Sequence, residues 1–450
     1  MGNDNNNKSV KATKPSKRAA FNLWTNTRDI FVRPDQRMPL IDGVRAFSIL
    51  YVLVFHGLVA MAVLLTGDTR TEVFREFVQD TPWYWQWVLM GDRGVDAFFV
   101  ISGFLIGQIL FREYEKTGGI NLKRFFIRRW LRLTPVYMLV IVVFAVLAGP
   151  HIVGSLMENR ELSLMQALGV FLGSMLAYAT YVNNFLPFEQ GNYIPFAWSL
   201  AAEEQFYILF SLFMAFAYGR IQNKLRFLLL LFAASFFIRW LLFYLNPHLL
   251  VTGDLLLGGP KELIADYWEI IYSNLYTRFG AVILGIILAY LYVYNWQQVV
   301  AWMDRSRSNL LVFIAFLLAG SMSVLPIYTG EEIPMWMHYL YHVGHRNLFS
   351  LAVALLILTA LFPFGIGGMI GRILSSRFFY PISQLSYSIY LVHLPLLVIC
   401  ALLLRATGNV QELSYGNMFI VLAFAMPFIF FFSAILYVLI ERPFMKLRRP

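Results

Sequence analysis

Long hydrophobic runs alternate along most of the chain with short polar segments, and the runs are long enough to cross a lipid bilayer. They cover approximately residues 40–66, 94–111, 133–149, 163–182, 197–218, 226–245, 274–294, 309–326, 347–365, 382–404 and 416–440. A helix of roughly 20 apolar residues spans the hydrocarbon core. Because hydrophobicity is continuous within each run rather than alternating, a β-barrel is excluded. The pattern predicts an all-α polytopic membrane protein.

Basic residues concentrate in some of the polar segments and predict which segments face the cytoplasm. The segment 112–132 contains seven Lys and Arg residues, and further basic residues lie at 220–226, 305–307, 372–377 and near the C-terminus. This distribution places both termini in the cytoplasm and predicts about ten transmembrane helices.

The region between the first two basic segments conflicts with a simple alternation of crossings. Three hydrophobic runs lie there, and three crossings cannot join two cytoplasmic segments. Either one basic segment breaks the charge rule or one run does not cross. We expect a re-entrant or interfacial segment within 133–196, because NNFLPFEQGNYIPF at 183–196 is irregular and contains two prolines. Non-helical backbone at membrane depth must contact protein or a water-filled cavity.

Composition supports a membrane protein with one large domain. Charged residues make up 14% of the chain and hydrophobic residues 59%, whereas a soluble protein carries about 25% charged residues. The formal net charge of +10 is explained by loops that face anionic membrane lipids, so no nucleic acid partner is expected. We expect a disordered basic cytoplasmic tail at 1–38, a transmembrane domain at 39–445, and a basic cytoplasmic tail at 446–450. The single cysteine, Cys400, lies inside a hydrophobic run and excludes an intrachain disulfide.

The first run, LIDGVRAFSILYVLVFH at 40–56, contains two residues that are costly inside a membrane. Arg45 and His56 are eleven positions apart, so on a helix they share one face to within ~20° and lie ~16 Å apart along its axis. Arg45 follows the basic tail and therefore lies nearer the cytoplasm. A snorkelling Arg and a His bonded to a neighbouring helix are the structural alternative. Because a neutral imidazole can take up a hydroxyl proton and return it, we predict that His56 is catalytic.

The basic segment RRWLRLTP leads into the third run. Arg129 and Arg132 are three residues apart and are neighbours on one helical face. They are either topology anchors or a clamp for an anion at the membrane surface, since guanidinium groups bind phosphates well. A cytoplasmic donor that carries phosphates, such as a coenzyme A ester, would suit such a clamp.

Further polar residues lie inside the runs at 197–218 and 382–404. Glu203 and Glu204 are placed where carboxylates either pair internally with an Arg or take part in function, for example by orienting His56. Tyr207 shares a helical face with Glu203. Ser386, Tyr390 and His393 form a polar stripe that lines a cavity or bonds neighbouring helices. His338, His342 and His345 have a metal-like spacing without a clear carboxylate, and we predict no metal site.

Six segments, taken together and in order, resemble the acyltransferase-3 family of membrane acyltransferases. The resemblance rests on the Arg–ten residues–His motif of the first run, on the Arg-x-x-Arg of RRWLRLTP, and on four further pieces: GVDAFFVISGFL at 94–105, WSLAAEEQFY at 198–207, SYSIYLVHLPL at 386–396 and ERPF at 441–444. The segments span nearly the whole chain from residue 38.

The resemblance implies an enzyme of the bacterial inner membrane that transfers an acyl group from a cytoplasmic acyl-CoA to a hydroxyl. Acetyl-CoA is the expected co-substrate, with succinyl transfer as an alternative, and the expected acceptor is an envelope or secreted polysaccharide. It also implies that His56 is catalytic and that Arg45, Arg129 and Arg132 serve the donor. Some members carry a fused extracytoplasmic SGNH-type domain. This chain ends soon after ERPF, so we expect a separate periplasmic SGNH-type partner if a second step is needed.

The predicted site therefore combines two catalytic residues with a binding set. The catalytic residues are His56 and Glu203, and the residues predicted to bind acyl-CoA or substrate are Arg45, Ser102, Arg129, Arg132, Trp198, Tyr207 and His393. Direct transfer with His56 as base and a covalent acyl-His route both remain open. The competing function is a proton-coupled transporter or flippase of a glycan or lipid intermediate, which predicts titratable residues along a full path and symmetric halves. Here the notable charges gather in the first half of the chain, and no clear repeat is visible.

Overall fold

The computed structural model describes residues 17–34, 38–66, 72–250, 261–324 and 334–447, and these residues form helices and connecting turns without any strand. Among them, eight helices are long and apolar enough to cross a membrane. They are α3 (Pro39–Thr66), α6 (Arg93–Thr117), α7 (Leu122–Arg160), α11 (Lys224–Leu245), α13 (Leu275–Tyr294), α16 (Met335–Ala360), α18 (Phe379–Ala406) and the continuous segment Tyr415–Leu447, which comprises α19, η7 and α20. The chain is an all-α polytopic membrane protein, as the hydrophobic pattern predicted.

Two further helices are nearly as long but carry charged residues in their first half. α10 (Trp198–Phe216) has 19 residues and α15 (Arg305–Val324) has 20. The predicted total of about ten crossings includes these two. The predicted run at 163–182 forms α8 (Leu164–Ala179), whose 16 residues rise only about 24 Å, less than the hydrocarbon thickness.

The region 183–197 is irregular, as its sequence indicated. It contains the short helices η2 (Asn183–Phe185), α9 (Phe188–Gly191) and η3 (Pro195–Ala197), and η3 leads directly into α10. Buried side chains hold this segment against the protein: the Tyr178 hydroxyl donates to Gly191 O at 3.0 Å and accepts from Ile194 N at 2.9 Å. The re-entrant or interfacial segment expected within 133–196 stays a prediction.

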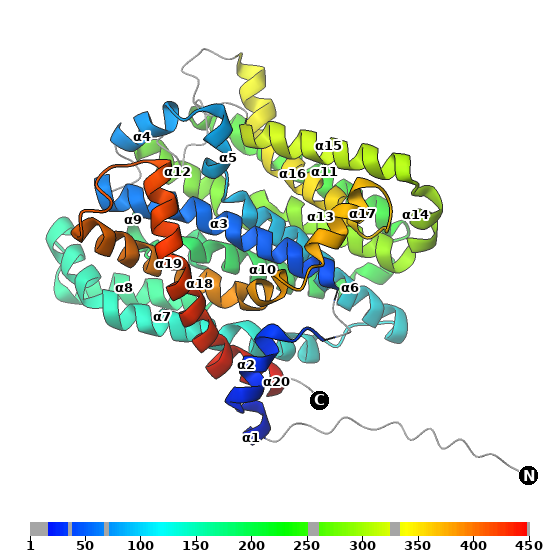
Figure 1. The fold of residues 1–450 in the computed structure, drawn as a ribbon, viewed down its shortest axis with the longest axis horizontal. Coiled ribbons are helices and arrows are strands. Elements are labelled where there is room, and N and C mark those ends of the chain that lie inside the picture. The colour runs from blue at the N-terminus through cyan, green and yellow to red at the C-terminus, as the bar shows by residue number, and fades with distance from the viewer. Residues whose placement is uncertain (1–16, 35–37, 67–71, 251–260, 325–333, 448–450) are drawn as a thin grey trace, which may run out of the picture.

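The parallel pair α6 and α13 forms the centre of the molecule. Gly103 and Gly285 allow the two backbones to touch, because a Cβ on Gly103 would lie 2.1 Å from Val282 O and a Cβ on Gly285 would lie 2.0 Å from Val100 O. Small residues at a crossing permit this close approach in membrane proteins. α3 packs against α6 on one side and against α18 and α19 on another, and it crosses the middle of Figure 1. The helix that carries Arg45 and His56 is therefore enclosed by protein.

The predicted disorder of residues 1–38 is wrong for the part of this tail that the structure describes. α1 (Lys17–Ala20) and α2 (Leu23–Phe31) are helical and lie beside α20 (Figure 1). Asp29 forms ion pairs with Arg442 at 2.8 Å and Lys446 at 3.1 Å, and the Asn26 side chain donates to Val438 O at 3.1 Å. Contacts with the far end of the chain order a segment whose own composition is polar. Residues 1–16 and 448–450 lie outside the described part, as do the tail predictions that fall on them.

Candidate active site

A pocket lies between α3, α6, α7, α10 and α18. It gathers six residues of the predicted site from four separate stretches of sequence: Arg45, Ser102, Arg129, Arg132, Glu203 and Tyr207. The remaining wall is largely apolar and includes Val95, Phe98, Phe99, Leu105 and Ile106 of α6. The pocket thus combines guanidinium groups with a hydrocarbon lining, which suits a ligand with an anionic head and a flexible, less polar arm.

Arg129 is held in the pocket by two carboxylates. Its Nε donates to Glu204 at 3.1 Å and its Nη2 to Glu203 at 3.4 Å. The guanidinium also lies over the Tyr207 ring, which fixes its plane. The internal ion pair that the sequence left as the alternative to a catalytic glutamate is therefore present.

Glu203 is the glutamate that lines the pocket. Its Oε1 accepts the Ser102 hydroxyl at 2.5 Å and the Tyr207 hydroxyl. The contacts of Glu203 join α6, α7 and α10, and none of its hydrogen bonds reaches His56. Ser102 and Tyr207 therefore serve as hydrogen-bond donors to Glu203 in this structure. No contact with the His56 imidazole supports the catalytic role predicted for Glu203, and that role stays a prediction.

A third carboxylate lies near the other two arginines of the pocket. Glu441 is buried, accepts the Ser388 hydroxyl at 2.8 Å, and interacts electrostatically with Arg132 and Arg45. Among the described residues at this pocket, three guanidinium groups are thus accompanied by three carboxylates. Arg129 is oriented by two of these acids, and its bonds to them use two of the five N–H groups of a guanidinium.

His56 and His393 form a pair of imidazoles behind the pocket. Their ring centroids are 4.7 Å apart and their planes cross at 73°. The His56 Nδ1 lies 3.0 Å from Val52 O and the His393 Nδ1 lies 2.7 Å from Tyr390 O. A carbonyl oxygen can only accept, so in both rings Nδ1 carries a hydrogen. When such a ring is neutral, its lone pair is on Nε2. This tautomer is the one that an Nε2 base or nucleophile requires.

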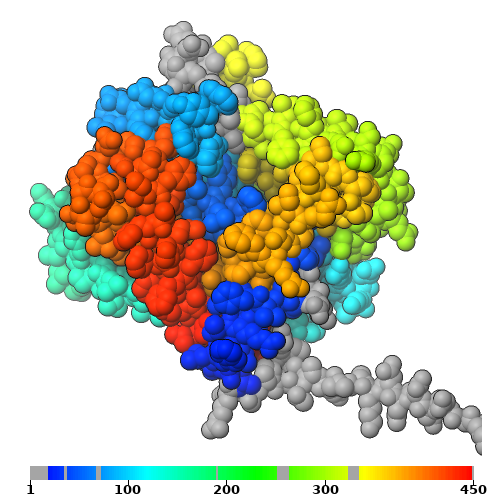
Figure 2. Space-filling model, in the orientation of Figure 1, coloured from blue at the N-terminus to red at the C-terminus, as the bar shows by residue number. Residues whose placement is uncertain are grey.

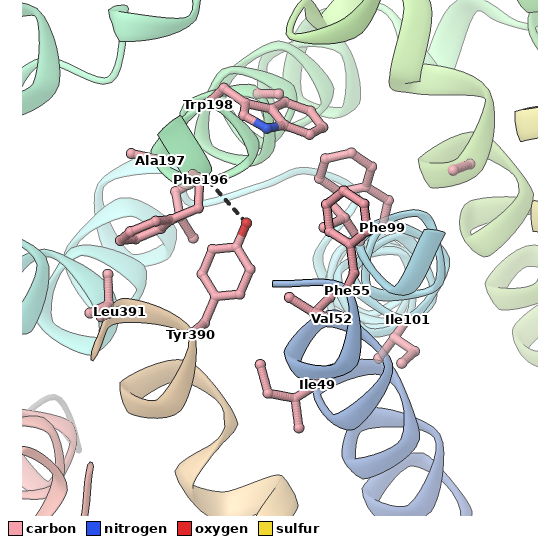
Figure 3. Packing of buried hydrophobic residues seen from close by; sticks show 14 of the residues in the cluster. Ile49, Val52, Phe55, Phe99, Ile101, Phe196, Ala197, Trp198, Tyr390 and Leu391 are labelled. Carbon is pink, nitrogen blue, oxygen red and sulfur yellow. Dashed lines mark hydrogen bonds between the residues drawn. The ribbon is translucent and has the colours of Figure 1, made fainter. Parts of the chain in front are cut away.

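Tyr390 connects the pocket with the histidine pair. Its ring lines the pocket and lies 5.6 Å from the His393 ring. Its hydroxyl is 2.6 Å from the Ser199 hydroxyl and donates to Phe196 O at 3.0 Å, the bond drawn in Figure 3. Figure 3 also shows that Tyr390 from α18 faces Val52 and Phe55 of α3 and Phe99 of α6. The irregular segment before α10 therefore forms one wall of this region.

Trp198 lies outside the pocket lining and belongs to a buried charge network that the sequence analysis missed. The indole stacks on Arg278, whose guanidinium carbon is 4.8 Å from the ring centroid. Arg278 donates to Asp96 at 3.3 Å, and Arg346 bridges Asp96 at 2.9 Å and Asp92 at 2.5 Å. All four charged groups are almost completely buried. The signal was present as Asp96 within GVDAFFVISGFL and as Arg346 within a largely apolar helix, since such residues are rare at membrane depth.

Among the described residues, the three histidines of α16 belong to no group that could hold a metal ion. His338, His342 and His345 are buried, and the His342 ring lies 5.1 Å from the Phe243 ring. Within the described ranges, no group of three or more His, Cys, Asp or Glu side chains could hold a metal ion.

A second, larger hollow lies on the opposite face of α3. It lies between α3, α15, α16 and α17 (Gly365–Leu374), and its lining is almost entirely hydrocarbon. Figure 2 shows α3 at the bottom of this hollow beside α15 and α17. Because it lacks polar groups, it offers no chemistry for a reaction.

The comparisons with known proteins agree with these features. The chain is 26% identical over 366 residues to O-acetyltransferase OatA of Staphylococcus aureus, strains NCTC 8325 and COL, which covers 80% of this chain and 51% of each relative. A protein of strain MSSA476 that is provisionally named an O-acetyltransferase is 27% identical over 365 residues, with 79% of this chain and 50% of the relative covered. The chain therefore spans about half the length of the curated relatives that it matches.

No solved structure matches the chain. The profile of the acyltransferase-3 family, described as an acyltransferase domain, matches residues 39–438. This match includes nearly all of the transmembrane helices, the pocket and both histidines. The chain belongs to the acyltransferase-3 family of membrane acyltransferases.

Proposed function

We propose that this protein is a membrane O-acyltransferase that moves an acyl group from a cytoplasmic acyl-CoA to a hydroxyl of an envelope or secreted polysaccharide. The proposal is supported by the family match and by the O-acetyltransferase names of the relatives. Acetyl is the proposed acyl group, in keeping with those names, and succinyl is the alternative. The structural observation that carries the proposal is an arginine-lined pocket next to two paired imidazoles.

The pocket would receive the donor at its arginine-rich part. Arg45, Arg129 and Arg132 would bind phosphate oxygens of coenzyme A, since guanidinium groups make charge-assisted bonds to phosphates. The pantetheine arm is flexible and only moderately polar, so the apolar wall of α6 can accommodate it. The thioester would then approach Tyr390 and the histidine pair.

His56 would act as the base in direct transfer. Its Nε2 lone pair takes the proton of the acceptor hydroxyl while that oxygen attacks the thioester carbonyl. The tetrahedral intermediate collapses with cleavage of the carbon–sulfur bond, and the coenzyme A thiolate takes the proton from Nε2. In the alternative route Nε2 attacks the thioester first and the acyl group then passes from the imidazole to the hydroxyl. His393 would keep the His56 ring in place through the contact between the two rings.

We place the protein in the bacterial inner membrane with its donor pocket open to the cytoplasm. The basic residues near the start of α7, which include Arg129 and Arg132, support this orientation by the charge rule. The acceptor would arrive from the other side, and a periplasmic SGNH-type partner would complete delivery if the acyl group must travel further.

Replacement of His56 tests this function directly. Purified protein in lipid nanodiscs receives labelled acetyl-CoA and a polysaccharide acceptor, and release of free coenzyme A thiol is measured. We expect His56→Ala to lose at least about 100-fold in rate, because a general base contributes that much or more. His151→Ala, at an exposed position on α7, is the matched control and should keep full activity. Undiminished turnover by His56→Ala would rule out its catalytic role.

A further inference from the structure

We infer that Asp92 is a positioning residue that stabilises the positive charge formed on His56 during acyl transfer. This inference rests on the proposed function and adds a group that lies outside the pocket. Asp92 precedes the first residue of α6 and is 3% exposed. The following observations place its turn against the part of α3 that leads to His56 and show that one of its oxygens takes no hydrogen bond.

The turn that contains Asp92 packs closely on α3. A Cβ on Gly91 would lie 2.4 Å from Tyr51 O and 2.7 Å from the Phe55 Cβ, and a Cβ on Gly94 would lie 2.5 Å from Ser48 O. Only glycine permits these approaches, so residues 91–94 lie directly against the turns of α3 that precede His56. From this position the Asp92 carboxylate acts electrostatically on the His56 ring.

The two oxygens of Asp92 have different surroundings. Oδ2 accepts from Arg346 at 2.5 Å and from the Tyr272 hydroxyl at 3.2 Å. Oδ1 is buried and takes no hydrogen bond from any residue that the structure describes. Burial of a carboxylate oxygen without a hydrogen-bond donor costs free energy. A positive charge that forms nearby offsets this cost, because the oxygen attracts it. The neighbouring Asp96 differs, because its two oxygens bind Arg278 and Arg346.

The other charged and titratable groups around His56 explain why Asp92 is suited to this role. His393 from α18 donates through Nδ1 to Tyr390 O at 2.7 Å, and a proton on its Nε2 would repel an imidazolium at His56. Tyr390 from the same helix is bonded to Ser199. Arg278 of α13 and Arg346 of α16 are engaged by Asp96 and Asp92, and Arg93 donates to the Tyr341 hydroxyl at 3.1 Å. Asp92 supplies the negative charge that faces His56 in this set.

The chemistry needs no bond to Asp92. The proton of the acceptor hydroxyl moves to His56 Nε2, which makes the ring a cation in a site of low dielectric, where a nearby carboxylate is strongly stabilising. The proton then moves to the coenzyme A thiolate and the charge disappears. An acyl-imidazole on His56 also passes through a cationic state, so the same carboxylate serves either route.

The test compares Asp92→Asn with Asp96→Asn in nanodiscs. We expect Asp92→Asn to lower kcat about 10- to 100-fold while KM for acetyl-CoA changes less than about twofold, because Asp92 does not contact the donor pocket. Loss of the carboxylate makes protonation of His56 harder, so the acidic limb of the kcat–pH profile should move to lower pH. Asp96→Asn should lower thermal stability through Arg278 and Arg346 and leave the acidic limb in place.

A second variant keeps the charge network balanced. Asp92→Asn with Arg346→Gln removes one acid and one base and leaves Asp96 paired with Arg278. It should fold like the unaltered protein and show the same loss in kcat and the same displaced limb. The inference would be overturned if kcat were unchanged, or if both variants lost rate without displacement of the acidic limb. In either case His56-dependent turnover of the unaltered protein would still support the proposed function. Absence of His56-dependent turnover in the unaltered protein would overturn both.

Discussion

At the scale of single residues, the charges of the pocket are arranged as pairs. The sequence left Arg129 as either a topology anchor or part of an anion clamp, and it left Glu203 and Glu204 as either catalytic or paired with an arginine. The structure shows both glutamates on Arg129, with Ser102 and Tyr207 on Glu203. Arg129 therefore serves the fold as well as any donor, and a simple alanine variant would confuse the two roles.

A comparison of two variants separates these roles. Arg129→Ala leaves two buried carboxylates without their cation, which costs about 3–5 kcal/mol, so its melting temperature in detergent should fall clearly. The triple variant Arg129→Ala, Glu203→Gln and Glu204→Gln removes the charges together and should recover most of that stability. Its affinity for acetyl-CoA, measured by calorimetry, should remain weak. Donor affinity equal to that of the unaltered protein would limit Arg129 to a structural role.

At the scale of helices, the crossing of α6 and α13 sets the geometry of the site. Gly103 at this crossing is the neighbour of Ser102 in the pocket wall, and the buried ion pair of Asp96 and Arg278 joins the same two helices nearer their N-termini. Any separation of the two helices therefore moves the pocket wall and the charge network together.

Gly103→Ala tests this dependence. The new Cβ would lie 2.1 Å from Val282 O, and backbone cannot give way as a flexible side chain can, so we expect a destabilisation of about 3 kcal/mol or more. Thermal unfolding and acyl transfer should both decline. Gly154→Ala on α7, where no atom lies within 4 Å of the added Cβ, is the control and should behave like the unaltered protein. Equal stability of the two variants would contradict the close crossing.

At the scale of the whole molecule, the proposed orientation in the membrane rests on the distribution of basic residues. The segment 112–132 is strongly basic, although the structure divides it between the end of α6, a short turn and the start of α7. The segment between α18 and α19 lies at the opposite end of α18 from Arg377. On the charge rule these two segments face opposite sides of the membrane.

Cysteine labelling in cells can check this orientation because the natural sequence contains one cysteine. In a Cys400→Ala background, we expect Glu412→Cys to react with a membrane-impermeant maleimide once the outer envelope is permeabilised. Thr117→Cys should react only after the inner membrane is opened. Both positions are exposed. Reaction of Thr117→Cys in intact inner membranes would reverse the orientation and move the arginine pocket away from cytoplasmic acyl-CoA.

The sequence by itself determined the properties that depend on neighbouring residues. Hydropathy and length predicted the transmembrane helices, and helical periodicity predicted that Arg45 and His56 share a face. In the structure Arg45 lines the pocket and His56 contacts His393. The six ordered motifs were sufficient for the family, which the profile match confirmed. These inferences succeed because helix formation in a bilayer is decided locally by backbone hydrogen bonding and side-chain transfer energies.

Tertiary structure decided which distant residues meet. The pairing of His56 with His393, of Arg129 with two glutamates, and of Arg346 with Asp92 and Asp96 each joins helices that are far apart in the sequence. It also ordered α2, whose polar side chains become partners of Arg442 and Lys446. No local pattern encodes such contacts, because they depend on how closely helices approach and at which depth their charged residues coincide. The leading features of the site, a matched set of charges and two paired imidazoles, are products of that packing.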